Sequence, residues 1–90
     1  MHFKDNVEKR RYETEVDGLK AFIEYNVAPD IITLEHIEVD KELSGRGIAS
    51  DLTEAVLMHL ESRDLKVIAN CPFIKSYIEK HPEWESILAK

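Results

Sequence analysis

The chain has 90 residues, of which 43% are hydrophobic and 33% are charged, and its formal net charge is -6. This balance is typical of one compact globular domain, so we expect a single domain over residues 1–90. The negative charge works against nucleic-acid phosphates and anionic lipids as partners, and no apolar run reaches the length of a membrane span.

The amino-terminal residues lack the apolar stretch of a secretory signal and the Arg/Ser-rich character of a transit peptide. The sequence holds one cysteine, Cys71, which cannot form an intrachain disulfide and so fits a reducing compartment. We therefore expect a cytoplasmic location.

The first half of the chain predicts three antiparallel strands. A polar, alternating segment over residues 7–16 predicts an edge strand, and Asp17-Gly18 offers the positive φ angles of a tight hairpin turn. Residues 19–27 then place alternate apolar side chains on one face, and residues 31–39 are rich in β-branched types.

The second half predicts helix, strand and helix. Residues 48–62 carry an apolar stripe at helical spacing, residues 65–69 form a short apolar run suited to a buried strand, and Pro72 suits the first position of a second helix. His81-Pro82 should end that helix. The expected inner face of the second helix and the terminal segment packed on the core comprise Phe73, Ile74, Tyr77, Ile78, Trp84, Ile87 and Leu88.

This element order predicts an α/β fold with a mixed sheet. A three-stranded antiparallel meander is followed by a parallel β-α-β crossover, which joins residues 31–39 to residues 65–69, and by a C-terminal helix. Ligands of such sheets bind beyond the carboxyl ends of the parallel strands, where the loops after both strands should meet.

A glycine-containing loop, Glu42-Leu43-Ser44-Gly45-Arg46-Gly47, precedes the first predicted helix. Unpaired N–H groups and the positive end of the helix dipole attract an anion such as a pyrophosphate there, although two glycines before a helix often form only a turn. In its context, the loop resembles the acetyl-CoA loop of the GNAT superfamily of N-acetyltransferases. Glu42 occupies the position where that family has Gln or Arg. A carboxylate beside a pyrophosphate is mildly unfavourable unless the Glu42 side chain points away.

A second motif extends the resemblance. Residues 67–73, ending in Asn70-Cys71-Pro72-Phe73, together with Tyr77-Ile78 and His81-Pro82, resemble a short GNAT-like subfamily with a Cys-Pro-Phe signature. The specific motifs cover the chain from about residue 31 onward, and the first two strands agree in topology alone.

The resemblance implies acetyl transfer from acetyl-CoA to an amine. It implies that the strand before the loop binds pantetheine through its main chain, and that the loop and the next helix hold the coenzyme. Together with Arg46 and Asn70, which their positions place near a phosphate and the pantetheine arm, the expected coenzyme-binding residues are Ile37, Glu38, Val39, Ser44, Gly45, Arg46, Gly47, Ile48, Ala49, Asn70 and Tyr77. For three of these a simpler role stays open, since Arg46 could be solvated, Asn70 could end a strand and Tyr77 could pack in the core.

The resemblance also implies His36 and Cys71 as the catalytic pair. Cys71 precedes a helix amino terminus, where a thiol could act as nucleophile or acid, or could equally be an inert small hydrophobe. Strict alternation puts His36 on the face of Leu34, and only a bulge would change its facing. The other histidines lack metal-ligand spacing with Cys71 or one another, so we expect no metal.

We therefore hypothesise an N-acetyltransferase acting on an unidentified amine. We expect this short chain to lack the amino-terminal helices with which larger members of the family shape the acceptor pocket. The acceptor could then bind an open face, or a homo-oligomer could complete the site. The alternatives are an acyl-CoA-binding or regulatory module without turnover, and an interaction domain without a coenzyme site.

Overall fold

The computed structural model describes residues 1–89, and its sheet has the strand order β1-β2-β3-β4-β5. The strands are β1 (Lys4–Asn6), β2 (Arg11–Val16), β3 (Leu19–Ala28), β4 (Ile31–Val39) and β5 (Lys66–Ala69). The helices are α1 (Ile48–Ser62) and α2 (Pro72–Lys80), with 3-10 turns η1 (Lys41–Leu43) and η2 (Pro82–Ile87). Neighbours from β1 to β4 are antiparallel and β5 is parallel to β4, which confirms the mixed α/β sheet.

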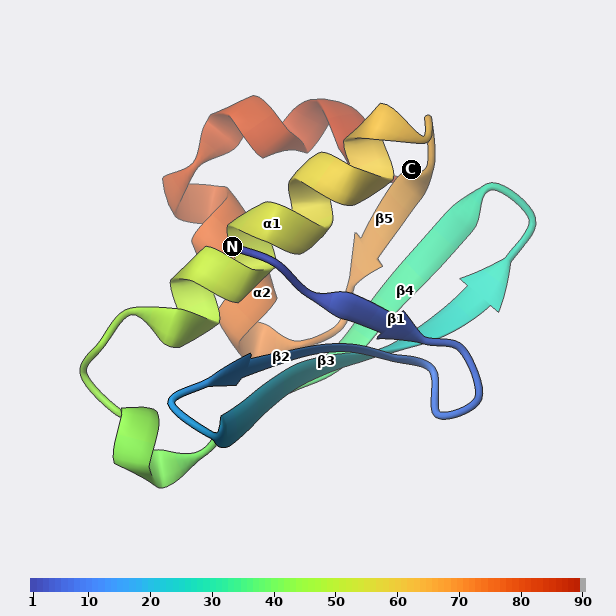
Figure 1. Cartoon of the computed structure of the whole chain (residues 1–90). Coiled ribbons are helices and arrows are strands. Elements are labelled where there is room, and N and C mark those ends of the chain that lie inside the picture. Colours follow the sequence, from blue (N-terminus) through green and yellow to red (C-terminus); the bar gives the residue numbers. More distant parts are fainter. Residues whose placement is uncertain (90) are drawn as a thin grey trace.

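The helices cover one face of the sheet. Figure 1 shows α1, α2 and the last turn on the same side of the strands. The inward side chains of β2 to β5 alternate with outward ones, as in any sheet with a single covered face. The buried apolar core comprises Tyr12, Ala21, Ile23, Tyr25, Ile32, Leu34, Leu43, Ile48, Leu52, Val56, Leu57, Leu60, Val67, Cys71, Ile74, Tyr77, Ile78, Trp84 and Ile87. The radius of gyration, 12.3 Å, fits a compact chain of this length.

The hairpin and the first helix lie where the sequence predicts them. Asp17 and Gly18 both have positive φ, 53° and 78°, as a two-residue hairpin turn requires. The bounds of α1 are those predicted, and neither helix of the described chain is long and apolar enough to cross a bilayer.

The predicted strand over residues 7–16 is wrong in its first four residues. Residues 7–10 form a turn, and residues 4–6 form β1, which pairs with β2 in the register Lys4↔Glu13. The Tyr25 hydroxyl donates a hydrogen bond to the Asp5 carboxylate and so ties β1 to β3. Tertiary pairing therefore overrides the local alternation of residues 7–10.

A β-bulge interrupts the pairing of β3 with β4. Glu24 pairs with His36 and Tyr25 with Leu34, so Glu35 is the extra residue of the bulge. Because one residue is inserted, the side chains beyond it change faces: Leu34 is buried, whereas His36 is exposed and Ile37 is half-buried. Two side chains predicted to face inward are exposed in the structure, Val27 at 57% and Phe73 at 39%.

Candidate functional site

The glycine loop ends at the amino terminus of α1. Gly45 and Gly47 have φ of 80° and 73°, and Gly47 is the N-cap of the helix. The first helical hydrogen bond runs from Asp51 N to Gly47 O (3.0 Å), so the N–H groups of residues 48–50 have no acceptor within the helix. In the described chain no side chain caps them either, which leaves three donors for an anion.

A cavity of about 350 Å³ opens beside these donors. It is lined by Val39, Asp40, Lys41, Leu43, Ser44, Gly45, Gly47, Ile48, Ala49, Ser50 and Phe73. A Cβ built on Gly45 or Gly47 would meet no described atom within 4 Å, so the space beside both glycines is open. The loop thus combines free donors with room for a group that approaches the backbone closely.

The carboxyl half of β4 has a free edge. Asp40 N donates to Lys20 O (3.0 Å), and by the alternation of an antiparallel pair His36 and Glu38 also direct their main-chain groups toward β3. Ile37 and Val39 therefore direct theirs away from β3, toward the side of β5. On that side β5 has already ended, because its last pair is Leu34↔Ala69.

The free edge leads into the loop cavity. Val39 belongs to the free edge and also lines the cavity, and Phe73 of α2 lines the same cavity. An elongated ligand with a phosphate at one end could therefore lie along β4 and place that phosphate at α1. The sequence pattern predicts Phe73 in the core, whereas the structure places it at the cavity. Its position just after the amino terminus of α2 was the signal that could have identified it as a site residue.

Charged side chains border the loop. Arg46 forms an ion pair with Asp17 across 2.9 Å, so its guanidinium is held toward the hairpin. Lys41 lines the cavity, whereas the exposed Glu42 is not among the lining residues of the described chain. Asp40, also at the cavity, accepts a hydrogen bond from Glu42 N at 2.9 Å.

The two residues implied as catalytic lie in different environments. Cys71 is 3% exposed within the core, and its N–H donates to Leu34 O (3.1 Å). The His36 side chain is 53% exposed on the open face of the sheet, with Nε2 3.6 Å from the Glu38 carboxylate. A bulge does occur, but it turns His36 out of the core rather than toward it, so the structure does not bring His36 and Cys71 together.

Asn70 and Tyr77 differ in their access to a ligand. Asn70 is exposed, and its amide nitrogen donates to Glu35 Oε1 (2.9 Å). Tyr77 is buried between α2 and the rest of the core, and its pKa is raised mainly by burial and next by the Glu54 carboxylate. Its hydroxyl therefore stays protonated at neutral pH.

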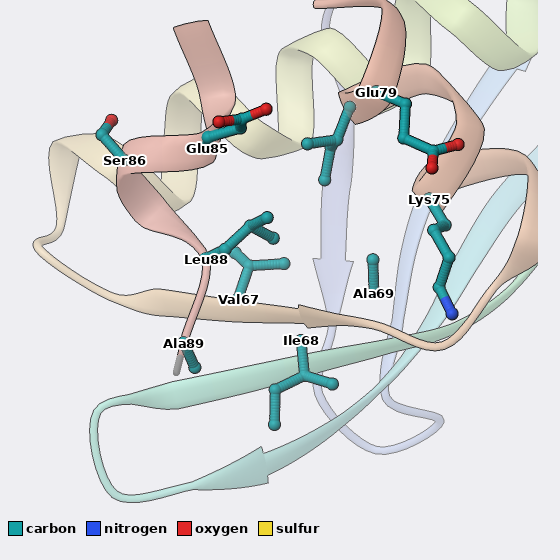
Figure 2. Close-up of a pocket in the computed structure, with 10 residues that line it drawn as sticks. Val67, Ile68, Ala69, Lys75, Glu79, Glu85, Ser86, Leu88 and Ala89 are labelled. Atoms are coloured by element: carbon teal, nitrogen blue, oxygen red, sulfur yellow. The ribbon is translucent and has the colours of Figure 1, made fainter. Parts of the chain in front are cut away.

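A larger groove of about 660 Å³ lies between β5, α2 and the last residues of the described chain. Figure 2 shows Val67 and Ala69 on the α2 side of the strand and Ile68 on the opposite side. The groove carries the carboxylates of Glu79 and Glu85 and one cation, Lys75, so its net negative charge disfavours a phosphate. The smaller loop cavity is therefore the better candidate site. Within the described residues, no group of three or more His, Cys, Asp or Glu side chains is placed to hold a metal ion.

Comparison with known proteins identifies the family. The pattern of the GCN5-related N-acetyl-transferase family matches residues 11–87, so the chain belongs to this family. It is thus an enzyme of the acetyltransferase class. The glycine loop and β4 are also the segments that the sequence resemblance implies for the coenzyme.

Individual proteins of known sequence or structure are similar to the chain. The chain is 32% identical to mouse Protein NATD1 over 83% of its own length and 71% of that protein, and human NATD1 matches at 32% over 82% and 68%. A GCN5-like protein from Staphylococcus aureus, solved by NMR, superposes with a TM-score of 0.73 at 29% identity, over 98% of this chain and 87% of that chain. A ribosomal-protein-alanine N-acetyltransferase from Brucella melitensis, at 23% identity and a TM-score of 0.53 over 89% and 61%, shares the fold.

Proposed function

We propose that the protein transfers the acetyl group of acetyl-CoA to an amine. The observation that carries this proposal is the free edge of β4, which leads from Ile37 through Val39 into the loop cavity at α1. Main-chain groups along the edge would bind the pantetheine arm, and the N–H groups of Ile48, Ala49 and Ser50 would bind the pyrophosphate.

The residues proposed for each part of the coenzyme follow from their positions. Ser44, Gly45 and Gly47 would surround the phosphates, with Arg46 as an added cation when it leaves Asp17. Phe73 would cover the ligand from the α2 side. Asn70 keeps its carbonyl oxygen available for the pantetheine amides, because its nitrogen is bound to Glu35. Glu38 is the least suited of the residues implied by the resemblance, because its main-chain groups face β3.

The chemistry best suited to this site is direct transfer. A neutral amine attacks the thioester carbon, the oxyanion receives main-chain hydrogen bonds, and the C–S bond breaks to give the amide and the coenzyme thiol. The amine loses one proton and the departing thiolate gains one, so the reaction needs no other reactant. Burial of Cys71 and its separation from His36 argue against an acetyl-cysteine intermediate.

The acceptor would be a primary amine on a cationic molecule, such as a polyamine or a basic peptide segment, because the net charge of -6 attracts positive ligands. The amine that reacts must first release its extra proton to solvent, so that it attacks in its neutral form. A second candidate function, an acyl-CoA-binding module without turnover, is favoured by one observation: the two residues implied as catalytic are not assembled. A panel of primary amines separates the two functions, since an enzyme releases coenzyme thiol above background hydrolysis and a binding module does not.

Coenzyme binding is tested by thermal unfolding. A ligand that binds only the native state at about 100 times its Kd adds about 2.7 kcal/mol of stability. Acetyl-CoA should therefore raise the melting temperature by several degrees, and adenosine diphosphate should act more weakly because it lacks the pantetheine arm. No shift with acetyl-CoA at millimolar concentration would refute the assignment of the loop.

A further inference from the structure

A carboxylate held by two amides lies where β4 and β5 part. Glu35 Oε1 accepts a hydrogen bond from Asn70 Nδ2 (2.9 Å), and Glu35 Oε2 accepts one from Asn26 Nδ2 (2.7 Å). Asn26 belongs to β3, Glu35 is the bulge residue of β4, and Asn70 directly follows β5. These three residues, here called the Glu35 clamp, connect three adjacent strands across the bulge.

The bulge decides how the free edge of β4 is presented. The extra residue reverses the direction in which the β4 residues after Leu34 point their main-chain groups. Ile37 and Val39 therefore point theirs toward the side of β5, beyond the point where β5 ends. A bulge also bends its strand and increases the local twist. The angle between β4 and the end of β5 therefore depends on how firmly Glu35 is held.

The clamp is suited to hold a strand rather than to move a proton. Hydrogen bonds from Asn70 and then Asn26 lower the pKa of Glu35, so the side chain is ionised at neutral pH and both bonds are charge-assisted. Both oxygens are occupied, and a carboxylate with a lowered pKa is a poor general base. These features fit a positioning role.

We propose that the Glu35 clamp positions acetyl-CoA indirectly, by fixing the angle at which β4 diverges from β5 and thus the slot that receives the pantetheine arm. Glu35 itself need not touch the coenzyme. The proposal rests on the function proposed above and adds to it the residue that shapes the site.

The test exchanges donor and acceptor within the clamp. Asn70→Asp turns a second carboxylate toward Glu35, whereas Glu35→Gln alone is the milder change, because a carboxamide can still turn its oxygen toward one of the two donors. Asn70→Asp therefore breaks the β4–β5 connection, and Glu35→Gln alone removes only the charge that strengthens it. The double change restores it, because the new amide at position 35 can donate to the new carboxylate at position 70.

Binding of acetyl-CoA is measured by titration calorimetry, with the KM for acetyl-CoA and kcat determined separately. Asn70→Asp should weaken binding only a few-fold, because the hydrogen bonds of Glu35 lie at exposed side chains where solvent screens them, and Glu35→Gln alone should have a smaller effect. The change should fall on KM rather than kcat, and the double variant should recover binding. Recovery is the decisive readout, because a general loss of stability would be worse in the double variant.

Glu13→Gln is the matched control. Glu13 Oε1 accepts a hydrogen bond from Asn6 Nδ2 (3.2 Å), which also joins an amide to a carboxylate between adjacent strands, but between β1 and β2. This variant should bind acetyl-CoA as the parent does. If Glu35→Gln does not fold, Asn26→Ala removes the other arm of the clamp at an exposed side chain, and it should weaken binding by a smaller factor.

The outcomes separate the two proposals. Parental binding in Asn70→Asp overturns the clamp while the coenzyme site stands, and so does a double variant that binds no better than Asn70→Asp. If the parent itself binds no acetyl-CoA, the proposed function fails and the clamp proposal fails with it.

Discussion

The amino termini of the two helices make an informative comparison. Both follow the carboxyl end of a strand in the parallel pair, and neither carries a side-chain cap in the described chain. Helix α1 begins at Gly47 in the left-handed region, with open space beside it, whereas α2 begins at the buried Cys71 in an extended conformation, followed by Pro72. Pro72 has no N–H, and the N–H of Cys71 is bound to Leu34 O.

The difference shows that position in the fold is not sufficient for an anion site. The end of a parallel strand and the helix dipole are common to both termini. Glycines at the first leave donors and open space for a ligand, whereas at the second proline removes one donor and the N-cap side chain is packed in the core. The family resemblance implies functional residues at both termini. The structure favours the terminus of α1 as a ligand site over that of α2.

The largest expected effect comes from Gly47→Val. At a φ of 73° a side chain is strained, so the free energy of unfolding should fall by about 1–2 kcal/mol. The added methyl groups would also occupy the space beside the donors of α1. We expect acetyl-CoA to produce no thermal shift in the folded variant.

Gly18→Val is the control for strain. Gly18 has a φ of 78° and equally open surroundings, but it belongs to the hairpin turn. It should lose comparable stability and keep coenzyme binding. If Gly47→Val binds acetyl-CoA as well as the parent does, the inference that the amino terminus of α1 is the coenzyme site is wrong.

Cys71→Ala should alter stability more than catalysis. Removing a fully packed sulfur from the core should cost about 1 kcal/mol, measured by denaturant unfolding. Turnover should persist to a large extent, and intact-protein mass spectrometry after mixing with acetyl-CoA should find no acetyl group on the parental Cys71. His36→Ala, at an exposed side chain, should leave stability unchanged. An acetyl group trapped on Cys71 would show that α2 also has a chemical role.

The smallest expected effect concerns Arg46. Its ion pair with Asp17 is between side chains 47% and 69% exposed, and such pairs contribute about 0–1 kcal/mol. Arg46→Ala should weaken coenzyme binding slightly, whereas Asp17→Asn should strengthen it slightly by releasing the guanidinium. Calorimetric titrations at low and high salt provide the check, since both differences should shrink as salt screens them. Equal affinities in all three proteins would remove Arg46 from the site.

Local features of the sequence sufficed for much of the fold. Asp17-Gly18 needs only its own backbone preferences to form a turn, and the stripe over residues 48–62 specifies a helix through spacing alone. The glycine loop was found in the same way, because a glycine pair before a helix is a local pattern. These predictions needed no knowledge of which strand pairs with which.

Features that depend on pairing between distant residues required the tertiary structure. The bulge at Glu35 exists because Glu24 of β3 pairs with His36, and this register alone turns His36 outward. In the same way β1 forms through its partner β2, and Cys71 is buried because the chain after β5 returns over Leu34. The sequence by itself determined where the hairpin turn, the helices and the glycine loop lie, since these depend on neighbouring residues. Only long-range packing decided which side chains meet at the site, because facing and burial are set by residues far apart along the chain.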